Sequence, residues 1–196
     1  MIFHDVIQNS DEWDVLRLGK FTASMISDLF MGENTLGYKK AIYKIAYERL
    51  TGEKPESFEP TNYMARGHEM EILARAKYED LNMVEVSNGG FWEYSDWIGC
   101  SPDGVCGKGI IEIKSPAYNT MIGYLLKPQL PTIYKYQVYS QLYITGKEYC
   151  DFICFHPKLP FICIRIERDE LLISEIQSRL ELSIKEVQRI IEIIKL

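Results

Sequence analysis

The spacing of apolar residues changes along the chain, from a helical period in the first third to strand-like runs in the middle. Helical spacing predicts helices over 24–31, 38–50 and 62–81. Period-two and continuous apolar runs follow, and they predict strands near 83–87, 90–94, 97–100 and 109–114. The remaining pattern predicts a helix over 132–145, strands near 148–155 and 161–166, and a long helix over 169–195. This alternation predicts an α/β fold, with a mixed central β-sheet flanked by helices and a long C-terminal helix.

Apolar residues also indicate which side of a helix faces the core. The apolar side of the 62–81 helix is predicted to comprise Met64, Ile72, Leu73, Ala76 and Leu81. The last helix carries a stripe of Leu172, Ile176, Leu180, Ile184, Val187, Ile191 and Ile194. Such a stripe predicts packing on the core, and a subunit interface is the alternative. Thr22 or Ser24 is the expected cap of the 24–31 helix, and 53–60 is the expected loop.

Length and composition favour one folded domain over residues 1–196. A chain of 196 residues with 46% hydrophobic and 26% charged residues is ordinary for a folded protein. No repeat or linker-like segment divides it, and no apolar run approaches the roughly 18–20 residues needed to span a bilayer. The N-terminal segment carries acidic residues and lacks a basic region, which argues against a signal peptide. These features predict a cytoplasmic protein.

Charge is unevenly distributed along the sequence. The formal net charge is −6, but residues 1–103 hold 10 basic and 18 acidic side chains, a net −8. Residues 104–160 carry a net +3, and residues 161–196 carry a net −1. The acidic total argues against a protein that coats nucleic acid by bulk charge alone. The basic middle segment offers candidates for a surface that faces nucleic acid, namely Lys108, Lys114, Lys127 and Lys135.

The five cysteines are predicted to be free thiols. They stand at positions 100, 106, 150, 154 and 163 without a CxxC pair, and a cytosolic environment keeps thiols reduced. Cys150, Cys154 and Cys163 are an alternative set of iron–sulfur ligands, but their spacing and the lack of a fourth nearby ligand argue against a cluster.

The strongest candidates for chemistry lie around a tight turn predicted at 106–109. If 110–114 is a strand, its side chains alternate, so Glu112 and Lys114 share one side. Asp103 precedes the turn, so the chain can return it beside Glu112. Two adjacent carboxylates repel unless a divalent cation lies between them, and Lys114 would then orient or deprotonate a water. A structural hairpin with a Glu–Lys ion pair is the alternative.

The motif Pro102-Asp103 followed by Glu112-x-Lys114 is similar to the signature of the PD-(D/E)XK nuclease superfamily. Other segments narrow the resemblance to the YqaJ-like viral recombinase family, the lambda-exonuclease type of alkaline exonuclease. These segments are, in chain order, Arg17-Leu-Gly-Lys-Phe-Thr-Ala-Ser24, Arg66-Gly-His-Glu-Met-Glu71 with Ala74 and Tyr78, Ser101-Pro-Asp103-Gly, Glu112-Ile-Lys114-Ser-Pro, and Tyr134-Lys-Tyr-Gln137 with Gln141 and Thr145-Gly146. Five segments in the family's order are more specific than any one of them.

The resemblance implies a metal-dependent active site. It implies that Asp103 and Glu112 bind the metal, that the Ile113 carbonyl is a further ligand, and that Glu71 completes the acidic cluster. The implied metal is Mg²⁺, with Mn²⁺ as a substitute, present as one or two ions. Lys114 would activate or orient the attacking water.

The resemblance also implies residues that position the site and bind the substrate. Gln137 would position the site from its helix, although either Gln137 or Gln141, one turn apart, can instead bond only to solvent or a strand end. Arg17, Ser24 and Ser101 match the positions that bind the 5′-terminal phosphate, for which arginine offers a planar fork of donors. Without the resemblance, Ser24 is as readily a helix cap, and Arg17 an ordinary surface charge.

The activity that the resemblance implies is a 5′-to-3′ exonuclease on linear double-stranded DNA with phosphorylated ends. It would release mononucleotides and leave 3′ single-strand overhangs for phage-type recombination by strand annealing. The resemblance further implies a ring-shaped homotrimer, a phage single-strand annealing protein as partner, and a phage or prophage origin in a bacterial host cell. A structure-specific or defence-type DNA endonuclease on the same core is one alternative. A non-catalytic scaffold that binds DNA ends is the other.

Overall fold

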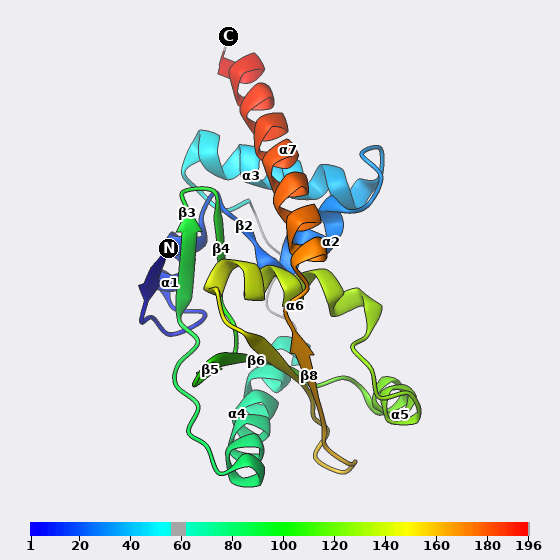
Figure 1. Ribbon diagram of the computed structural model, residues 1–196. Helices are drawn as coiled ribbons and strands as arrows, with labels where there is room; N and C mark the ends of the chain where they lie inside the picture. Colours follow the sequence, from blue (N-terminus) through cyan, green and yellow to red (C-terminus); the bar gives the residue numbers. More distant parts are fainter. Residues whose placement is uncertain (56–61, 196) are drawn as a thin grey trace.

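Helices and strands alternate along the chain in the computed structural model, which describes residues 1–55 and 62–195 (Figure 1). The helices are α1 (Asp11–Arg17), the short 3₁₀ helix η1 (Ala23–Met25), α2 (Ile26–Leu29), α3 (Leu36–Thr51), α4 (Asn62–Asn82), α5 (Tyr118–Leu126), α6 (Thr132–Thr145) and α7 (Glu170–Lys195). The strands are β1 (Ile2–His4), β2 (Phe21–Thr22), β3 (Phe91–Ser95), β4 (Ile98–Cys100), β5 (Gly104–Cys106), β6 (Gly109–Lys114), β7 (Tyr149–Cys154) and β8 (Ile162–Glu167). Over the described residues, no helix is both long and apolar enough to cross a membrane.

The strands form two mixed sheets of four strands each. The first has the order β1-β3-β4-β2, and its β2 and β4 run parallel. The second has the order β5-β6-β7-β8, in which β6 and β7 run parallel and the outer pairs are antiparallel. The chain between β6 and β7 contains α5 and α6. The predicted α/β class, with flanking helices and a long C-terminal helix, is therefore confirmed, and the β-structure is divided between two sheets.

Helices cover both faces of the second sheet, which lies between α4 and α6 in Figure 1. On one face, Ala74 and Tyr78 of α4 pack against Ile111 and Ile113 of β6. On the other face, α5 and α6 pack on a cluster that includes Ile110, the alternate position of the same strand. Because strand side chains alternate, Glu112 points to the α6 face.

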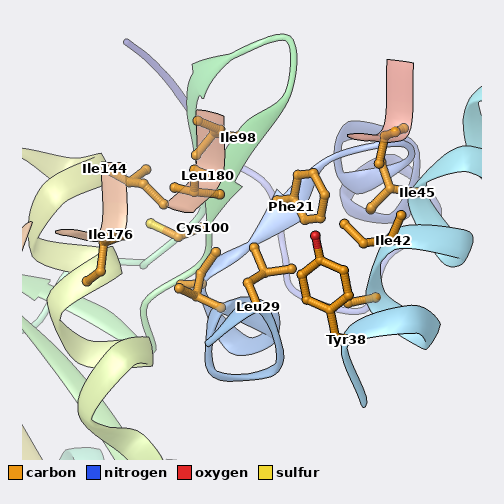
Figure 2. Packing of buried hydrophobic residues seen from close by; sticks show 14 of the residues in the cluster. Phe21, Leu29, Tyr38, Ile42, Ile45, Ile98, Cys100, Ile144, Ile176 and Leu180 are labelled. Atoms are coloured by element: carbon orange, nitrogen blue, oxygen red, sulfur yellow. The ribbon is translucent and has the colours of Figure 1, made fainter. Parts of the chain in front are cut away.

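The first sheet packs against α2, α3, α6 and α7 in a cluster shown in Figure 2. Its members include Phe21, Leu29, Tyr38, Ile42, Ile45, Ile98, Cys100, Ile144, Ile176 and Leu180. The predicted stripe of the last helix supplies Leu172, Ile176, Leu180 and Val187 to this core, with Ile184 and Ile191 partly buried. Packing of α7 on the core is therefore confirmed, although Ile194 near its end is exposed.

The predicted apolar side of α4 is wrong. Ile72, Leu73 and Leu81 are exposed, and so is Ala76, whereas the side chain of Met64 lies outside the described residues. The buried side consists of Met70, Ala74 and Tyr78, which follow each other at four-residue spacing. Both sets have helical spacing, so the sequence pattern could not distinguish the side that meets β6.

The predicted strand over 83–87 is also wrong, because only Ser87 makes an isolated bridge, to Val105. Met83 has a left-handed backbone with φ 53°, which ends α4, and the Val86 N–H donates to the Glu79 carboxylate instead of a neighbouring strand.

Several short elements depart from the sequence pattern. The predicted helix over 24–31 is a 3₁₀ turn followed by the single turn of α2, and Thr22 precedes it without a capping side-chain hydrogen bond. Residues 53–55 are irregular, and the rest of the predicted 53–60 loop lies outside the described residues. The pattern did not predict β1, α1 or α5. The expectation of free cysteines is confirmed for all five.

Candidate active site

Asp103 is held against β6 by backbone hydrogen bonds. Its own N–H donates to the Ile111 carbonyl at 3.1 Å, and its Oδ2 accepts from the Ile113 N–H at 2.6 Å. The β5–β6 hairpin therefore returns Asp103 beside the strand that carries Glu112. Burial raises the pKa of Asp103 well above its usual range, and the charges of Glu112 and Glu71 act in the same direction.

Close backbone packing fixes the segment that precedes Asp103. A Cβ at Gly89 would overlap the Pro102 carbonyl oxygen, so only glycine allows this approach. The same carbonyl accepts a hydrogen bond from Gln8 Nε2 at 2.9 Å. Gly89 and Gln8 thus fix the Pro102 carbonyl, and with it the residue that directly precedes Asp103.

Glu112 is almost completely buried, at 1% exposure, and its carboxylate is surrounded by donors. Lys114 Nζ lies 2.5 Å from Oε1, and Gln137 Nε2 donates to the same oxygen at 2.6 Å. Gln141 Nε2 donates to Oε2, also at 2.6 Å. Burying a carboxylate is costly unless such partners compensate for the lost water. The two glutamines of α6 therefore provide the hydrogen-bond donors that the isoleucines beside Glu112 in β6 lack.

Lys114 lies at the end of β6, partly buried, with its ammonium 5.1 Å from the centre of the Tyr134 ring. Burial acts to lower the pKa of Lys114, but the charges of Glu112 and Asp103 outweigh it and raise the pKa above its usual range. The ammonium therefore stays protonated and can donate to a water or to an anion.

Glu71 approaches this cluster from α4. Arg75, one turn further along the helix, lies 3.9 Å from Glu71 Oε1 and donates from the same nitrogen to the Asp103 carbonyl. Glu71 is also close enough to contribute to the raised pKa of Asp103. One guanidinium thus joins α4 to the segment that carries Asp103.

The oxygen atoms of Asp103, Glu112 and the Ile113 carbonyl fit a divalent cation that takes its remaining ligands from water and substrate. Within the described residues, no three His, Cys, Asp or Glu side chains form a ready metal-binding group. Asp103 and Glu112 nevertheless provide two neighbouring carboxylates whose mutual repulsion a cation would relieve. Mg²⁺ commonly takes one or two carboxylates, with water and substrate phosphates as its remaining ligands. The Ile113 carbonyl lies on the Asp103 side of β6, because both backbone groups of a strand residue point the same way.

The three candidate phosphate-binding residues form one connected group. The Arg17 guanidinium lies 3.9 Å from the centre of the Trp13 ring, and Trp13 Nε1 donates to Ser101 Oγ at 2.7 Å. On its other side, Arg17 Nη2 donates to Thr22 Oγ1 at 3.5 Å, and that hydroxyl lies 3.4 Å from Ser24 Oγ. Residues far apart in the sequence are thus brought together around one guanidinium.

The Arg17 guanidinium is partly buried and, within the described part of the chain, has no close acidic partner. Burial lowers the pKa of its guanidinium, with opposing contributions from Asp14 and more distant groups. Among the side chains that the structure describes, no carboxylate lies within 4.0 Å of it. A partly buried guanidinium without a close carboxylate keeps donors available for a phosphate.

Three residues of this region were not singled out from the sequence: Trp13, Arg75 and, as a residue of the site, Gln141. Each lies four positions from a residue that was, namely Arg17, Glu71 and Gln137. Side chains at this spacing share one helix face. That spacing is the signal that would have drawn attention to them.

The fold and this site define the class of lambda-exonuclease-like proteins within the PD-(D/E)XK superfamily. The family model of the YqaJ-like viral recombinase domain matches residues 12–148, and the chain belongs to this family. The chain is similar to LHK-Exo, an alkaline exonuclease from Laribacter hongkongensis whose structure is also known in complex with dAMP. For the dAMP complex, identity is 33% and the TM-score 0.88, covering 95% of this chain and 96% of that one.

Two more distant similarities extend the comparison. A phage-related exonuclease from Haemophilus somnus 129PT shares 17% identity with a TM-score of 0.67, over 89% of this chain and 96% of that chain, which supports the fold alone. The uncharacterized protein R354 of Acanthamoeba polyphaga mimivirus is 30% identical over 162 residues, 74% of this chain. This chain matches only 28% of the length of R354.

Proposed function

We propose that the protein is a metal-dependent deoxyribonuclease that digests linear double-stranded DNA in the 5′-to-3′ direction from phosphorylated ends. The observation that carries this proposal is the buried Glu112 carboxylate, held by Lys114 and Gln137 next to Asp103. A structural Glu–Lys ion pair would not need a second carboxylate beside it, yet Asp103 is held close enough for the charge of Glu112 to raise its pKa.

In this mechanism, Asp103 and Glu112 would hold the divalent cation, with the Ile113 carbonyl as a further ligand and Glu71 completing the acidic cluster. We propose Mg²⁺, which Mn²⁺ can replace, as one or two ions. When bound, the cation lowers the pKa of a water and stabilises the charge on the phosphate. Lys114 orients the attacking water and donates to the developing negative charge.

Gln137 has a positioning role in the same mechanism. It donates to the Glu112 oxygen that Lys114 also contacts, and so keeps this oxygen on the side of the ammonium. The side chain itself stays neutral and does not take part in proton transfer.

The connected group of Arg17, Ser24 and Ser101 binds the terminal 5′-phosphate. Ser101 is two residues from Asp103, so this group lies near the scissile bond. Recognition of the end would start each cycle at the terminal nucleotide and release mononucleotides, leaving 3′ single-strand overhangs for recombination by strand annealing. The dAMP complex of LHK-Exo supports a nucleotide product of this size.

The assembly and cellular setting form a separate part of the proposal. We propose a ring-shaped homotrimer around DNA. Apolar side chains that are exposed in the single chain, including Ile72, Leu73 and Leu81 of α4, are candidates for its subunit contacts. A phage single-strand annealing protein would receive the overhangs. Membership of a viral recombinase family supports the recombination role. The setting we propose for it is the cytoplasm of a bacterial host, with a phage or prophage origin.

Digestion of matched DNA substrates tests the activity. The purified protein is incubated with Mg²⁺ and with end-labelled linear duplexes that carry either a 5′-phosphate or a 5′-hydroxyl, and with closed circular DNA. We expect rapid loss of the phosphorylated duplex, labelled mononucleotides from its 5′ end, intact circles, and no cleavage in EDTA. Cleavage of circles would instead identify an endonuclease, and binding without products a scaffold.

A further inference from the structure

Gln141 makes a contact to the proposed metal-binding carboxylate that the proposed mechanism does not use. Its Nε2 donates to Glu112 Oε2 at 2.6 Å, and both residues are 1% exposed. Gln141 lies in the middle of α6, and Leu142 beside it is completely buried. The contact is therefore held in position by the core of the protein.

The two oxygens of Glu112 have different environments. Oε1 faces the partly buried side chains of Gln137 and Lys114, so it lies toward the side from which solvent and substrate approach. Oε2 faces the interior, and among the described residues Gln141 is its hydrogen-bond donor. We call Oε1 the outer oxygen and Oε2 the inner oxygen.

The side chain of Gln141 is a poor choice for packing alone. Its own Oε1 is buried, and within the described part of the chain it has no hydrogen-bond partner. A buried acceptor without a partner lowers stability, whereas an apolar side chain of similar size would fill the same space without that cost. The hydrogen bond to Glu112 is the interaction that a glutamine adds at this position.

We propose that Gln141 is a positioning residue, which fixes the inner oxygen of Glu112 and so keeps the outer oxygen directed at the reaction site. This inference rests on the proposed function of the Asp103–Glu112 site. Without the inner hydrogen bond, the carboxylate can rotate about its last side-chain torsion, which is broad. The outer oxygen then spends less time in the orientation that binds the cation.

The test compares the wild-type protein with Gln141→Met, which keeps the side-chain length and removes the donor. Outer-sphere partners of metal ligands are worth about 10–100-fold in metal affinity or activity. We expect kcat on the 5′-phosphorylated duplex to fall by about that factor, with KM for DNA unchanged. Mn²⁺ affinity, measured by electron paramagnetic resonance without DNA, should weaken in parallel. The melting temperature should fall, because the buried inner oxygen loses its donor, and circular dichroism at the assay temperature should show that the variant is still folded.

Ser140→Ala is the matched control, because Ser140 is a buried residue of the same helix whose hydroxyl also has no partner among the described residues. Its hydroxyl makes no hydrogen bond to Glu112, so the kcat and Mn²⁺ affinity of Ser140→Ala should equal those of the wild type. Glu112→Gln provides the reference for a site without its carboxylate charge. Gln141→Leu is a second variant in case Gln141→Met does not fold.

The outcomes separate this inference from the proposed function. If wild-type protein cleaves no DNA, the proposed function fails. The positioning role of Gln141 is then tested by comparing the Mn²⁺ affinity of Gln141→Met with that of the wild type. If Gln141→Met retains both the kcat and the Mn²⁺ affinity of the wild type, the positioning role is overturned. Loss of folding in both Gln141 variants would show that the residue is structural, and would also overturn it.

Discussion

Trp13 donates its indole N–H to the Ser101 hydroxyl at 2.7 Å, and this bond joins α1 to the segment that leads into Asp103. The same indole ring lies against the guanidinium of Arg17. One side chain therefore holds two of the three proposed phosphate-binding residues. Because Ser101 is two residues from Asp103, the proposed phosphate-binding group and the proposed metal-binding carboxylate Asp103 are carried by the same segment.

Replacing Arg17 with methionine is expected to remove the preference for phosphorylated ends. Hydrogen bonds to a charged group are worth about 1.5–3 kcal/mol, which corresponds to about a 10–100-fold slower cleavage of the 5′-phosphorylated duplex. The rate on the 5′-hydroxyl duplex should not change. Arg189→Met removes a charge from the exposed side of α7 and is the control. A phosphate preference that survives in Arg17→Met would disprove the assignment.

Replacing Lys114 with methionine is expected to abolish cleavage, with a loss of at least about 100-fold, as for other groups that stabilise transition-state charge. The fold should persist, because both glutamines still donate to Glu112. Single-turnover cleavage and circular dichroism measure the two effects. Lys185→Met, an exposed substitution on α7, is the control. Substantial residual cleavage by folded Lys114→Met would contradict the proposed site.

Tyr78 anchors α4 to the second sheet, and its loss should destabilise the protein. Its hydroxyl donates at 2.6 Å to the buried Asp151, which Arg165 also binds with two hydrogen bonds of 2.9 and 2.8 Å. Tyr78→Phe leaves part of this carboxylate without a donor, so the free energy of unfolding in urea should fall by about 1–3 kcal/mol. The exposed Tyr118→Phe should change it by less than about 0.5 kcal/mol. Equal free energies of unfolding for the wild type and Tyr78→Phe would show that the Tyr78–Asp151 hydrogen bond does not stabilise the protein.

Cys163 should react slowly with alkylating reagents at neutral pH. Burial of its thiol, together with the charge of Asp151, raises its pKa to about 11. A raised pKa lowers the fraction of reactive thiolate at any given pH. Labelling of the folded protein with iodoacetamide should therefore accelerate about tenfold per pH unit between pH 8 and 10. The other four cysteines are buried and should stay unlabelled. A rate that levels off near pH 8.5 would indicate an ordinary thiol.

The sequence predicted best where one strand or one hairpin sets the geometry. The alternation in β6 directs Glu112 toward α6, and the short turn to β5 returns Asp103 beside the strand. Both relations follow from local strand geometry, which residue spacing encodes directly. The long helix α7 was also predicted from local spacing, because its apolar stripe repeats over many turns.

The sequence predicted less where a tertiary partner decides. Two sets of apolar residues in α4 have helical spacing, and only the position of β6 determines that Ala74 and Tyr78 are the buried ones. The spacing of Gln137 and Gln141 places them on one face, but whether one or both reach Glu112 depends on the distance between α6 and β6. The pattern cannot supply such distances between elements.

The parallel pairing of β6 and β7 has a consequence for the order in which the protein folds. The two carboxylates of the site can meet within a hairpin that closes over a few residues. Gln137 and Gln141, the glutamine donors to Glu112, reach it only after the chain that crosses from β6 toward β7 has folded back over the sheet. Contacts between distant residues require closure of longer loops and form later than local ones. The acidic pair therefore needs only local chain closure, whereas its donors from α6 need the full crossover.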